Sequence, residues 1–392
     1  MFYLILFSLA LVSTWWIYKK VLKIAIIKNI VDKPEARKIQ LVPVPVLGGL
    51  AVFFGIVVAL TSACFYYEMG SLFVIMGALA IMLYVGTLDD ILGLSPAYRF
   101  VVEILVVLLL IFCNKSSLDS FHGLWNIYSI PQYLSVPLTV FACVGIMNAI
   151  NLIDGVNGLS SGYCIVACIC FFITFLVAGD KYAACLAAVS AGSLIPFFCH
   201  NVFGSKSKMF IGDGGALMMG TVLASLVIIA LSSESILAAR VDDNFGIVAF
   251  TLAVLAIPVF DTLRVMFARI VRGRSPFQPD RTHFHHLLFD LGFSHIGTTS
   301  FEILSNMLVV LLWWLSYRSG ASADLQLYIV VFTSVLITFG FYKFVRIQIQ
   351  KQSKIYYFLQ KIGAMTHVGH SAWFLKFRDF LDRGCSGIKR EC

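Results

Sequence analysis

Long runs of apolar residues recur along the whole chain, and only short polar segments separate them. A helix needs roughly 20 apolar residues to cross a bilayer, with a range of about 17–25. The runs are continuous and do not alternate, which excludes a transmembrane strand barrel. The pattern predicts an all-α polytopic membrane protein of about 11 spanning helices, near residues 2–18, 46–66, 71–88, 100–113, 133–150, 160–178, 182–199, 214–231, 244–262, 302–317 and 325–342.

The composition agrees with this pattern. Of the 392 residues, 59% are hydrophobic and 13% are charged, whereas soluble domains carry about 25% charged residues. The first segment, MFYLILFSLALVSTWWIYKK, has no cationic start and no small-residue cleavage site. We therefore expect a retained first helix, not a removed signal peptide.

The basic residues lie on one side of the predicted topology. Loops 19–45, 89–99, 200–213 and 263–301, with the tail from Lys343, hold 25 of the 29 Lys and Arg residues. The opposite side holds only Lys115, Lys181, Arg240 and Arg318. Basic loops stay in the cytoplasm, so we predict an outside N-terminus and a cytoplasmic C-terminus. Attraction to anionic lipid explains much of the +8 net charge, and no nucleic-acid partner is expected.

The chain divides into one membrane domain, residues 1–342, and a basic cytoplasmic tail, residues 343–392. The tail mixes basic and aromatic residues, as in AWFLKFRDF. Two interpretations stay open for it: an amphipathic helix on the membrane surface, or a solvated and partly ordered segment.

Six aspartates fall at the predicted cytoplasmic boundary of the spans, in five separate segments. Carboxylates at helix ends inside a membrane protein are costly and usually functional. They occur in the segments YVGTLDD, NLIDG, FIGDGG, PVFDTLR and QPD, as Asp89, Asp90, Asp154, Asp213, Asp261 and Asp280. For Asp261, which closes the ninth predicted span, an ion pair with Arg264 is the simpler alternative.

Cationic side chains gather on the same side: Arg37, Lys38, Arg99, and the segment PDRTHFHH with Arg281, His283, His285 and His286. A transition-metal site is disfavoured because no cysteine accompanies the histidines. Oxygen ligands suit Mg²⁺, which also binds substrate phosphates. Basic side chains, glycine turns and Mg²⁺ are what a diphosphate needs. The residues therefore predict a cytoplasm-facing Mg²⁺–phosphate site for a soluble anion, a lipid, or both.

The stretch NAINLIDGVNGLSSG, residues 148–162, contributes amide and carboxylate oxygens. Asn148 and Asn151 share a helix face, and Asp154 lies about 120° away from Asn148. Gly155 and Gly158 then allow a tight turn. A plain capped helix end is an equally good interpretation of this stretch alone.

Together these motifs resemble the polyprenyl-phosphate N-acetylhexosamine-1-phosphate transferases, the WecA/MraY group. The segments DKPEARK, PVPVLGG, TLDD, NAINLIDGVNGL, FIGDGGA and SPFQPDRTHFHHLL occur in the family's order over residues 30–300. The form PDRTHFHH is similar to the WecA-like branch. Gln40 stands where the family commonly has a histidine, and Ala216 departs from its commoner Gly-Asp-(Ala/Thr)-Gly-Ser form.

The resemblance implies transfer of an N-acetylhexosamine 1-phosphate, most simply of GlcNAc, from a UDP-sugar to undecaprenyl phosphate, with release of UMP. It implies Mg²⁺ as cofactor, with Mn²⁺ as an alternative, held by Asn151 and Asp213. Its catalytic residues would be Asp89, Asp90, Asp154, His283, His285 and His286. Its substrate-binding residues would be Arg37, Lys38, Arg99, Asn148, Asn157, Phe210, Asp280 and Arg281, with Phe210 stacked on uracil and Asn157 bonded to it. Asp154 has a second interpretation, as a brace for its turn.

Other functions and substrates stay open at this point. An anion transporter would carry its polar residues near the bilayer midplane, whereas these gather at one face. A CDP-alcohol phosphatidyl transferase needs an Asp-rich motif that the chain lacks, and an inactive scaffold would have lost some of the acids. GalNAc, FucNAc or QuiNAc could replace GlcNAc, and a homodimer is a further alternative. The expected location is the bacterial inner membrane, with the site facing the cytoplasm.

Overall fold

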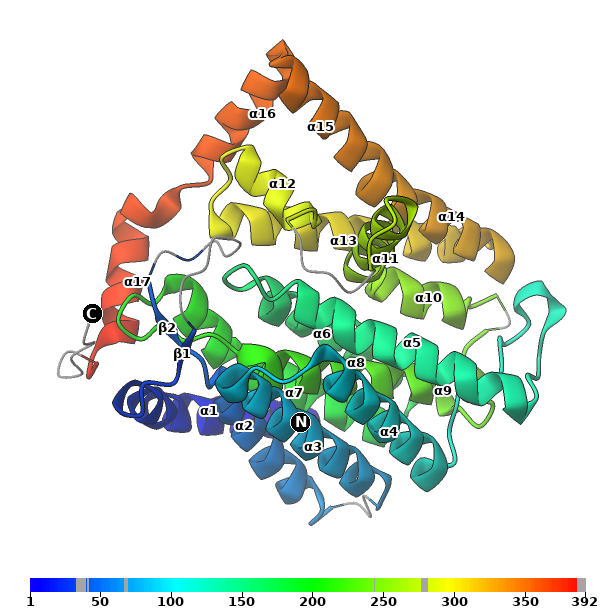
Figure 1. Ribbon diagram of the computed structural model, residues 1–392. Helices are drawn as coiled ribbons and strands as arrows, with labels where there is room; N and C mark the ends of the chain where they lie inside the picture. The colour runs from blue at the N-terminus through cyan, green and yellow to red at the C-terminus, as the bar shows by residue number, and fades with distance from the viewer. Residues whose placement is uncertain (33–39, 41, 67–69, 243, 276–280, 386–392) are drawn as a thin grey trace.

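The computed structural model describes residues 1–32, 40, 42–66, 70–242, 244–275 and 281–385 (Figure 1). Within these residues nine helical segments are long and apolar enough to cross a membrane. They are α1 (Phe2–Ile27), α3 (Gly70–Leu92), α4 (Pro96–Asn114), α5 (Gln132–Leu152), α6 (Leu159–Ala178), α7 (Lys181–Phe203), α8 (Gly212–Leu231), α13 (His295–Arg318) and the continuous segment Ala323–Gln350. A bent helix pair makes a tenth candidate, and the shorter apolar helix α2 (Gly48–Ala63) covers the remaining predicted run. The all-α polytopic fold is confirmed.

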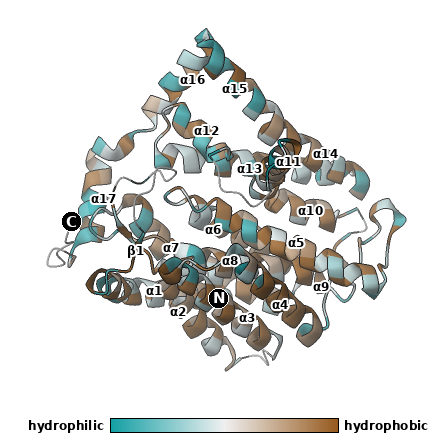
Figure 2. Cartoon of the chain, viewed as in Figure 1, coloured by the Kyte–Doolittle hydropathy of each residue, from teal (hydrophilic) through white to brown (hydrophobic). Residues whose placement is uncertain are grey.

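Short elements connect and flank these helices. Strands β1 (Val31–Asp32) and β2 (Val44–Pro45) pair antiparallel, with Val31 opposite Pro45. The others are η1 (Leu124–Asn126), α9 (Ile236–Arg240), α12 (Phe284–Asp290), α14 (Ala323–Val335), η2 (Leu336–Phe341), α15 (Tyr342–Lys351), α16 (Lys354–Met365), η3 (Val368–His370) and α17 (Ala372–Asp382). Hydrophobic residues dominate α2, α3 and α4, whereas polar residues are frequent on α12 and α16 (Figure 2).

Helix α8 lies in the core, and 94% of its most apolar 18-residue stretch is buried. Its first turn carries consecutive glycines, which let neighbouring helices approach closely. A Cβ at Gly86 of α3 would overlap the backbone of Gly214, and a Cβ at Gly49 of α2 would overlap that of Gly215. The start of α8 is thus pressed against the end of α3, and this contact positions the acidic residues of both.

The ninth predicted span is a bent pair, α10 (Ile247–Val254) and α11 (Ala256–Val271), with 76° between the two helices. Pro258 accounts for the break, because proline has no N–H and its ring clashes with the carbonyl four residues earlier, at Val254. Asn306 of α13 satisfies the exposed backbone: its amide donates to the Val254 carbonyl over 3.1 Å and accepts from Ile257 N over 3.0 Å.

This bend corrects two sequence-based expectations. Asp261 was predicted to close a span, but it lies inside α11, which continues to Val271. The described part of the predicted loop 263–301 is largely helical, since it contains the end of α11, all of α12 and the start of α13. A hydropathy pattern predicts the end of a span where charged residues begin. Here Asp261 and Arg264 are buried as an ion pair, so helix α11 continues past them.

The C-terminal region consists of successive helices that lead away from the bundle and then return to it. Helix α14 runs through the π-helical turn η2 into α15 without a break, so the helix crosses the predicted boundary at residue 342. In Figure 1, α16 and α17 then return toward α1 and α7. The tail is helical up to Asp382, and α17 packs on α7. The division into two domains stays a prediction.

Candidate active site

Two carboxylates and one guanidinium meet where α3 ends and α8 begins. Asp89 accepts a hydrogen bond from Arg99 Nη1 over 3.0 Å and another from Leu94 N over 2.7 Å. The same Arg99 nitrogen lies 3.8 Å from Asp213 Oδ2. The Asp213 side chain is 38% exposed, so it remains open to a ligand. The structure therefore brings together Asp89, Arg99 and Asp213 from three separate segments of the chain.

Asp90 faces the N-terminus of α8. Its carboxylate oxygens accept from Asp213 N over 3.1 Å and from Gly214 N over 3.5 Å. Helix N-termini have unpaired N–H groups and favour negative charge. Gly212 has φ +77°, and a Cβ there would collide with the Asp90 carboxylate. These contacts give Asp90 a partner in the protein, the first turn of the helix that carries Asp213; its catalytic assignment stays a prediction.

Glu103 is a site residue that sequence reasoning missed. It lies one turn after Arg99 in α4, is fully buried, and approaches Arg99 Nε to 3.5 Å. Asn148 donates its side-chain amide to Glu103 and to the Val144 carbonyl. Asn148, predicted to bind substrate, is thus connected to Asp89 through Glu103 and Arg99. The available signal was a single acid inside the apolar run 100–113.

The turn after α5 places Gly155 beside the histidine helix α12. Asp154 accepts from the Ser160 hydroxyl at the start of α6. Burial, together with the nearby charge of Asp213, raises the pKa of the Asp154 carboxyl to about 8. A Cβ at Gly155 would lie 3.5 Å from His285 Nε2. The turn therefore lies next to His285, a predicted site residue, and Gly158, the N-cap of α6, supplies no side-chain cap.

His283 is held by Asp261, the acid inside α11. Its Nδ1 lies 2.9 Å from Asp261 Oδ2, and Phe284 N donates to that oxygen over 3.2 Å. Arg264 binds the other oxygen through Nη2 over 2.5 Å, which confirms the predicted ion pair. Arg264 also donates to the Thr282 carbonyl over 2.7 Å and stacks 3.7 Å from the Tyr342 ring centre. Asp261 thus orients the first histidine of the motif.

The three histidine rings lie one beside the next. The centres of His283 and His285 are 5.7 Å apart, and those of His285 and His286 are 4.4 Å apart. Burial lowers the pKa of His285 well below its usual value, and the neighbouring His286 and His283 lower it further. His285 is therefore neutral near pH 7. Among the described residues, no group forms a hydrogen bond with His283 Nε2, so this nitrogen can bind a ligand.

Asp261→Asn should lower the stability of the protein strongly, because it leaves the buried Arg264 without its anion. Removing one partner of a buried ion pair costs about 3–5 kcal/mol. The matched control is Asp290→Asn, which removes the exposed pair with Arg346 and should cost at most about 1 kcal/mol. Thermal unfolding in detergent measures both. Equal shifts in Tm for the two variants would contradict this network.

Phe210 and Asn157 lie in two connected loops. Phe210 N donates to the Pro45 carbonyl over 2.8 Å, and Gly48 N donates to the Phe210 carbonyl over 2.9 Å. Asn157 N donates to His295 Nδ1 over 3.3 Å. Asn201, which sequence reasoning missed, joins the loops: it accepts from Gly158 N over 2.7 Å and donates to the Met209 carbonyl over 2.8 Å. The uracil contacts of Phe210 and Asn157 stay predictions.

Four other predicted site residues lie outside the contacts described above, and so does Gln40. Arg37, Lys38 and Asp280 lie outside the described residues. Arg281 is exposed just before α12. Gln40, the departure from the family pattern, donates to Asp32 Oδ2 over 2.7 Å and to the Asp32 carbonyl over 3.2 Å. Its amide thus binds the last residue of β1, a contact for which charge is not needed.

The donor set fits Mg²⁺ better than a transition metal. In the part of the chain that the structure describes, no three His, Cys, Asp or Glu side chains are grouped to hold an ion. Mg²⁺ needs fewer protein ligands, since one or two carboxylates with waters and substrate phosphates suffice. Asp213 offers an open carboxylate, and no hydrogen bond among the described residues involves the Asn151 side chain. The metal assignment itself is untested by these contacts.

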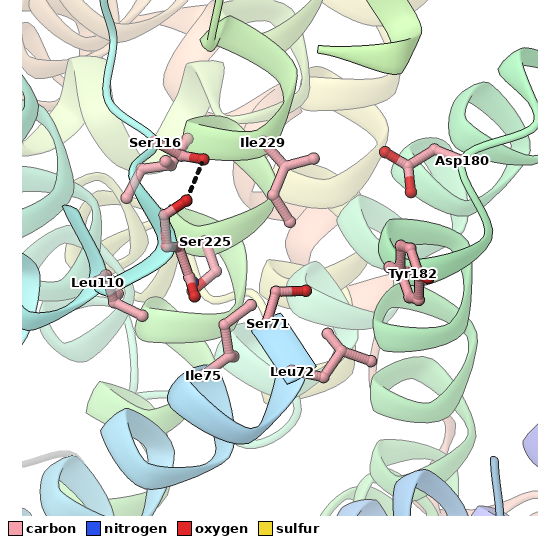
Figure 3. Close-up of a pocket in the computed structure, with 11 residues that line it drawn as sticks. Ser71, Leu72, Ile75, Leu110, Ser116, Asp180, Tyr182, Ser225 and Ile229 are labelled. Carbon is pink, nitrogen blue, oxygen red and sulfur yellow. Dashed lines mark hydrogen bonds between the residues drawn. The ribbon is translucent and has the colours of Figure 1, made fainter. Parts of the chain in front are cut away.

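A separate cavity of about 130 Å³ lies at the opposite ends of the same helices. Ser71, at the start of α3, and Ser225, near the end of α8, line it, with Asp180 and Tyr182 on another side (Figure 3). Asp180 is already the N-cap of α7, since it accepts from Ala183 N over 3.0 Å. The cavity is thus distinct from the carboxylate–histidine site, because Asp89 and Asp213 lie at the other ends of α3 and α8.

Carboxylates, a guanidinium and histidines lie at one end of an apolar helix bundle, an arrangement typical of integral membrane proteins that act on phosphorylated substrates. Residues 72–231 match the family model of glycosyl transferase family 4. The chain is 31% identical over 290 residues to "Probable undecaprenyl-phosphate N-acetylglucosaminyl 1-phosphate transferase" of Bacillus subtilis, covering 74% of this chain and 78% of that protein.

Two further relatives agree. "Decaprenyl-phosphate N-acetylglucosaminephosphotransferase" of Mycobacterium leprae is 31% identical over 291 residues, 67% of this chain and 70% of its own. "Undecaprenyl-phosphate alpha-N-acetylglucosaminyl 1-phosphate transferase" of Salmonella typhi is 29% identical over 279 residues, which cover 69% of this chain and 72% of that protein. The chain therefore belongs to glycosyl transferase family 4, as the resemblance of its motifs indicated.

Proposed function

We propose that this protein transfers N-acetylglucosamine 1-phosphate from UDP-N-acetylglucosamine to undecaprenyl phosphate and releases UMP. The observation that carries the proposal is the meeting of Asp89, Arg99 and Asp213, with the histidines of α12 beside the turn at Gly155. The names of the bacterial relatives support the acceptor and the sugar. Another UDP-amino sugar would use the same chemistry.

The reaction is a displacement at phosphorus. A phosphate oxygen of the lipid forms a bond to the β-phosphorus of the UDP-sugar, and the bond from that phosphorus to the bridging oxygen breaks. UMP leaves with the bridging oxygen. Phosphoryl transfers of this kind depend mainly on positioning and on neutralising charge. A one-step displacement needs no protein nucleophile, and we prefer it for that reason.

The side chains divide this task between them. Arg99, held by Asp89 and Glu103, would bind a phosphate oxygen, and the α12 histidines would bind the diphosphate. Bound Mg²⁺ would neutralise the diphosphate charge next to Asp213 and Asn151. Both Asp89 oxygens already accept hydrogen bonds, which favours an orienting role over that of a base. A phosphate monoester loses its second proton near about pH 6, so no strong base is required.

The setting of the site is part of the proposal. The segregation of Lys and Arg supports a cytoplasmic active site and a cytoplasmic C-terminus, in the inner membrane of a bacterium. A UDP-sugar would then enter from the cytosol and the polyprenyl phosphate from the same leaflet.

Membranes that contain the protein, supplied with undecaprenyl phosphate and a panel of UDP-sugars, should release UMP, and most rapidly with UDP-N-acetylglucosamine. Chelation by EDTA should stop the release, and added Mg²⁺ should restore it. Membranes without the protein are the control. Absence of UMP with every sugar would overturn the proposal and favour a transporter or a scaffold.

A further inference from the structure

The C-terminal helix α17 packs on the end of α7 through aromatic side chains. The Phe203 ring lies 5.2 Å from Phe377, 5.6 Å from Phe374 and 6.1 Å from Trp373. Phe380 lies 5.9 Å from Trp15 of α1. Aromatic pairs at these distances contribute about 0.5–1.5 kcal/mol each beyond the burial of their surface. The tail is thus held to the bundle by apolar contacts that are independent of any charge.

The last residue of α17, Asp382, binds the loop between α7 and α8. Its Oδ1 accepts from the Ser207 hydroxyl over 2.7 Å and from Ser207 N over 2.9 Å. Its Oδ2 accepts from Lys206 N over 3.1 Å, and both oxygens lie within 3.3 Å of Ser205 N. Three successive backbone N–H groups and one hydroxyl therefore converge on a single carboxylate, an arrangement typical of anion-binding loops.

The negative charge of Asp382 strengthens its contact with loop 205–207. Burial alone would raise the pKa of the Asp382 carboxyl, but the hydrogen bonds from Ser207, Lys206 and Ser205 lower it below the usual value. Hydrogen bonds to a charged acceptor are stronger than those between neutral groups. Because the pKa is lowered, the carboxylate keeps its charge, and the loop keeps its partner, on mild acidification.

The loop leads directly into the proposed donor site. Ser207 is also tied to α1, since Tyr18 donates to the Ser207 carbonyl over 3.0 Å. Two residues later Asn201 binds the Met209 carbonyl, and Phe210 and Asp213 follow. From Met209 on, neighbouring elements hold the backbone. Between Gly204 and Phe210, Asp382 binds the backbone N–H groups of Ser205, Lys206 and Ser207.

We propose that Asp382 is a positioning residue for the UDP-sugar site, which acts by fixing loop 204–208 so that Phe210 is presented to the nucleotide. This inference rests on the proposed function, because it assigns the nucleotide contact to Phe210. It extends the active site to the tail, which lies far beyond the residues 72–231 that define the family match. Loss of the contact lowers the fraction of molecules in the binding-competent form and weakens apparent donor affinity by the same factor.

The test compares Asp382→Asn with Asp379→Asn in the full-length protein. Asp379 lies one turn earlier on the same helix, and its side chain is 68% exposed beside Arg378. The first change removes the charge and one acceptor oxygen from the loop, whereas the second removes a surface charge only. Asp382→Asn should speed hydrogen–deuterium exchange in residues 203–208 and raise the KM for the UDP-sugar about tenfold. The KM for undecaprenyl phosphate and kcat should change less than about twofold.

The two readouts separate this inference from the proposed function. Exchange in loop 203–208 does not require activity, so the contact can be tested even if no UMP is released. Unchanged exchange in Asp382→Asn would refute the contact. Faster exchange with an unchanged donor KM would refute the positioning role. Equal effects of Asp379→Asn would show a general response to lost tail charge and would also overturn the inference.

Discussion

Asp213→Asn should reduce UMP release about a thousandfold while the protein still folds. The carboxylate lies at the first turn of α8, and its side chain is 38% exposed. In the described structure its nearest ionic contact is Arg99 at 3.8 Å, so the fold depends little on its charge. An amide keeps the shape of the side chain but removes the negative charge that would bind Mg²⁺ beside the diphosphate. Single electrostatic contributions of this kind are worth about a hundredfold to a thousandfold in rate.

The measurement is UMP release by purified protein with undecaprenyl phosphate and UDP-N-acetylglucosamine. Asp242→Asn is a suitable control, because Asp242 accepts a hydrogen bond from Tyr317 beyond the opposite end of α8. It should leave the rate unchanged. Thermal unfolding should show the same Tm for both variants and the original protein. If folded Asp213→Asn keeps more than about a tenth of the original rate, Asp213 does not hold the metal.

Gly86→Ala should destabilise the protein and remove most of its activity, although alanine favours helices. In a helix interior alanine is better than glycine by about 1 kcal/mol. A Cβ at Gly86, however, overlaps the backbone of Gly214, which cannot rotate away as a side chain can. Helices α3 and α8 must separate, at a cost typical of overpacking, about 1–3 kcal/mol. The same movement draws Asp89 away from Asp213.

Gly77→Ala is the matched control for this change. Gly77 lies in the same helix α3, and a Cβ there has no neighbour within 4 Å. This variant should be as stable as the original protein or slightly more stable, with unchanged UMP release. The decisive comparison is Tm and rate for the two alanine variants. A Gly86→Ala protein that matches Gly77→Ala in both would show that α3 and α8 do not touch at this point.

Much of the fold could be predicted from the sequence because a bilayer allows few solutions. Backbone groups in hydrocarbon must be bonded within the segment, so an apolar run of sufficient length becomes a helix. Every predicted run coincides with a described helix or helix pair. One boundary that failed lies near Asp261, where buried ion pairing with Arg264 lets helix α11 continue past its charges. Hydropathy counts these charges as if they were solvated.

The site could be predicted only in part. Asp89, Arg99 and Asp213 were expected to meet, and the structure places them within one set of contacts. Glu103, Asn201 and Asp382 were missed, because each acts through a partner at least 4 positions away or in a different element. Their residue types are ordinary in a helix or a tail. Only the approach of another helix turns them into supports for the site.

By itself, the sequence determined that this protein is a many-helix membrane protein, that its acids and histidines gather at one side, and that its motifs belong to a phosphosugar transferase family. These properties depend on local composition and on the order of short segments. The tertiary structure alone decided which side chains of remote segments pair. In it, α3 packs on α8 at Gly86 and Gly214, Asp90 binds the N-terminus of α8, and Asp382 binds the loop before Phe210. Such pairings depend on distances between remote segments, which side-chain packing sets and local patterns do not encode.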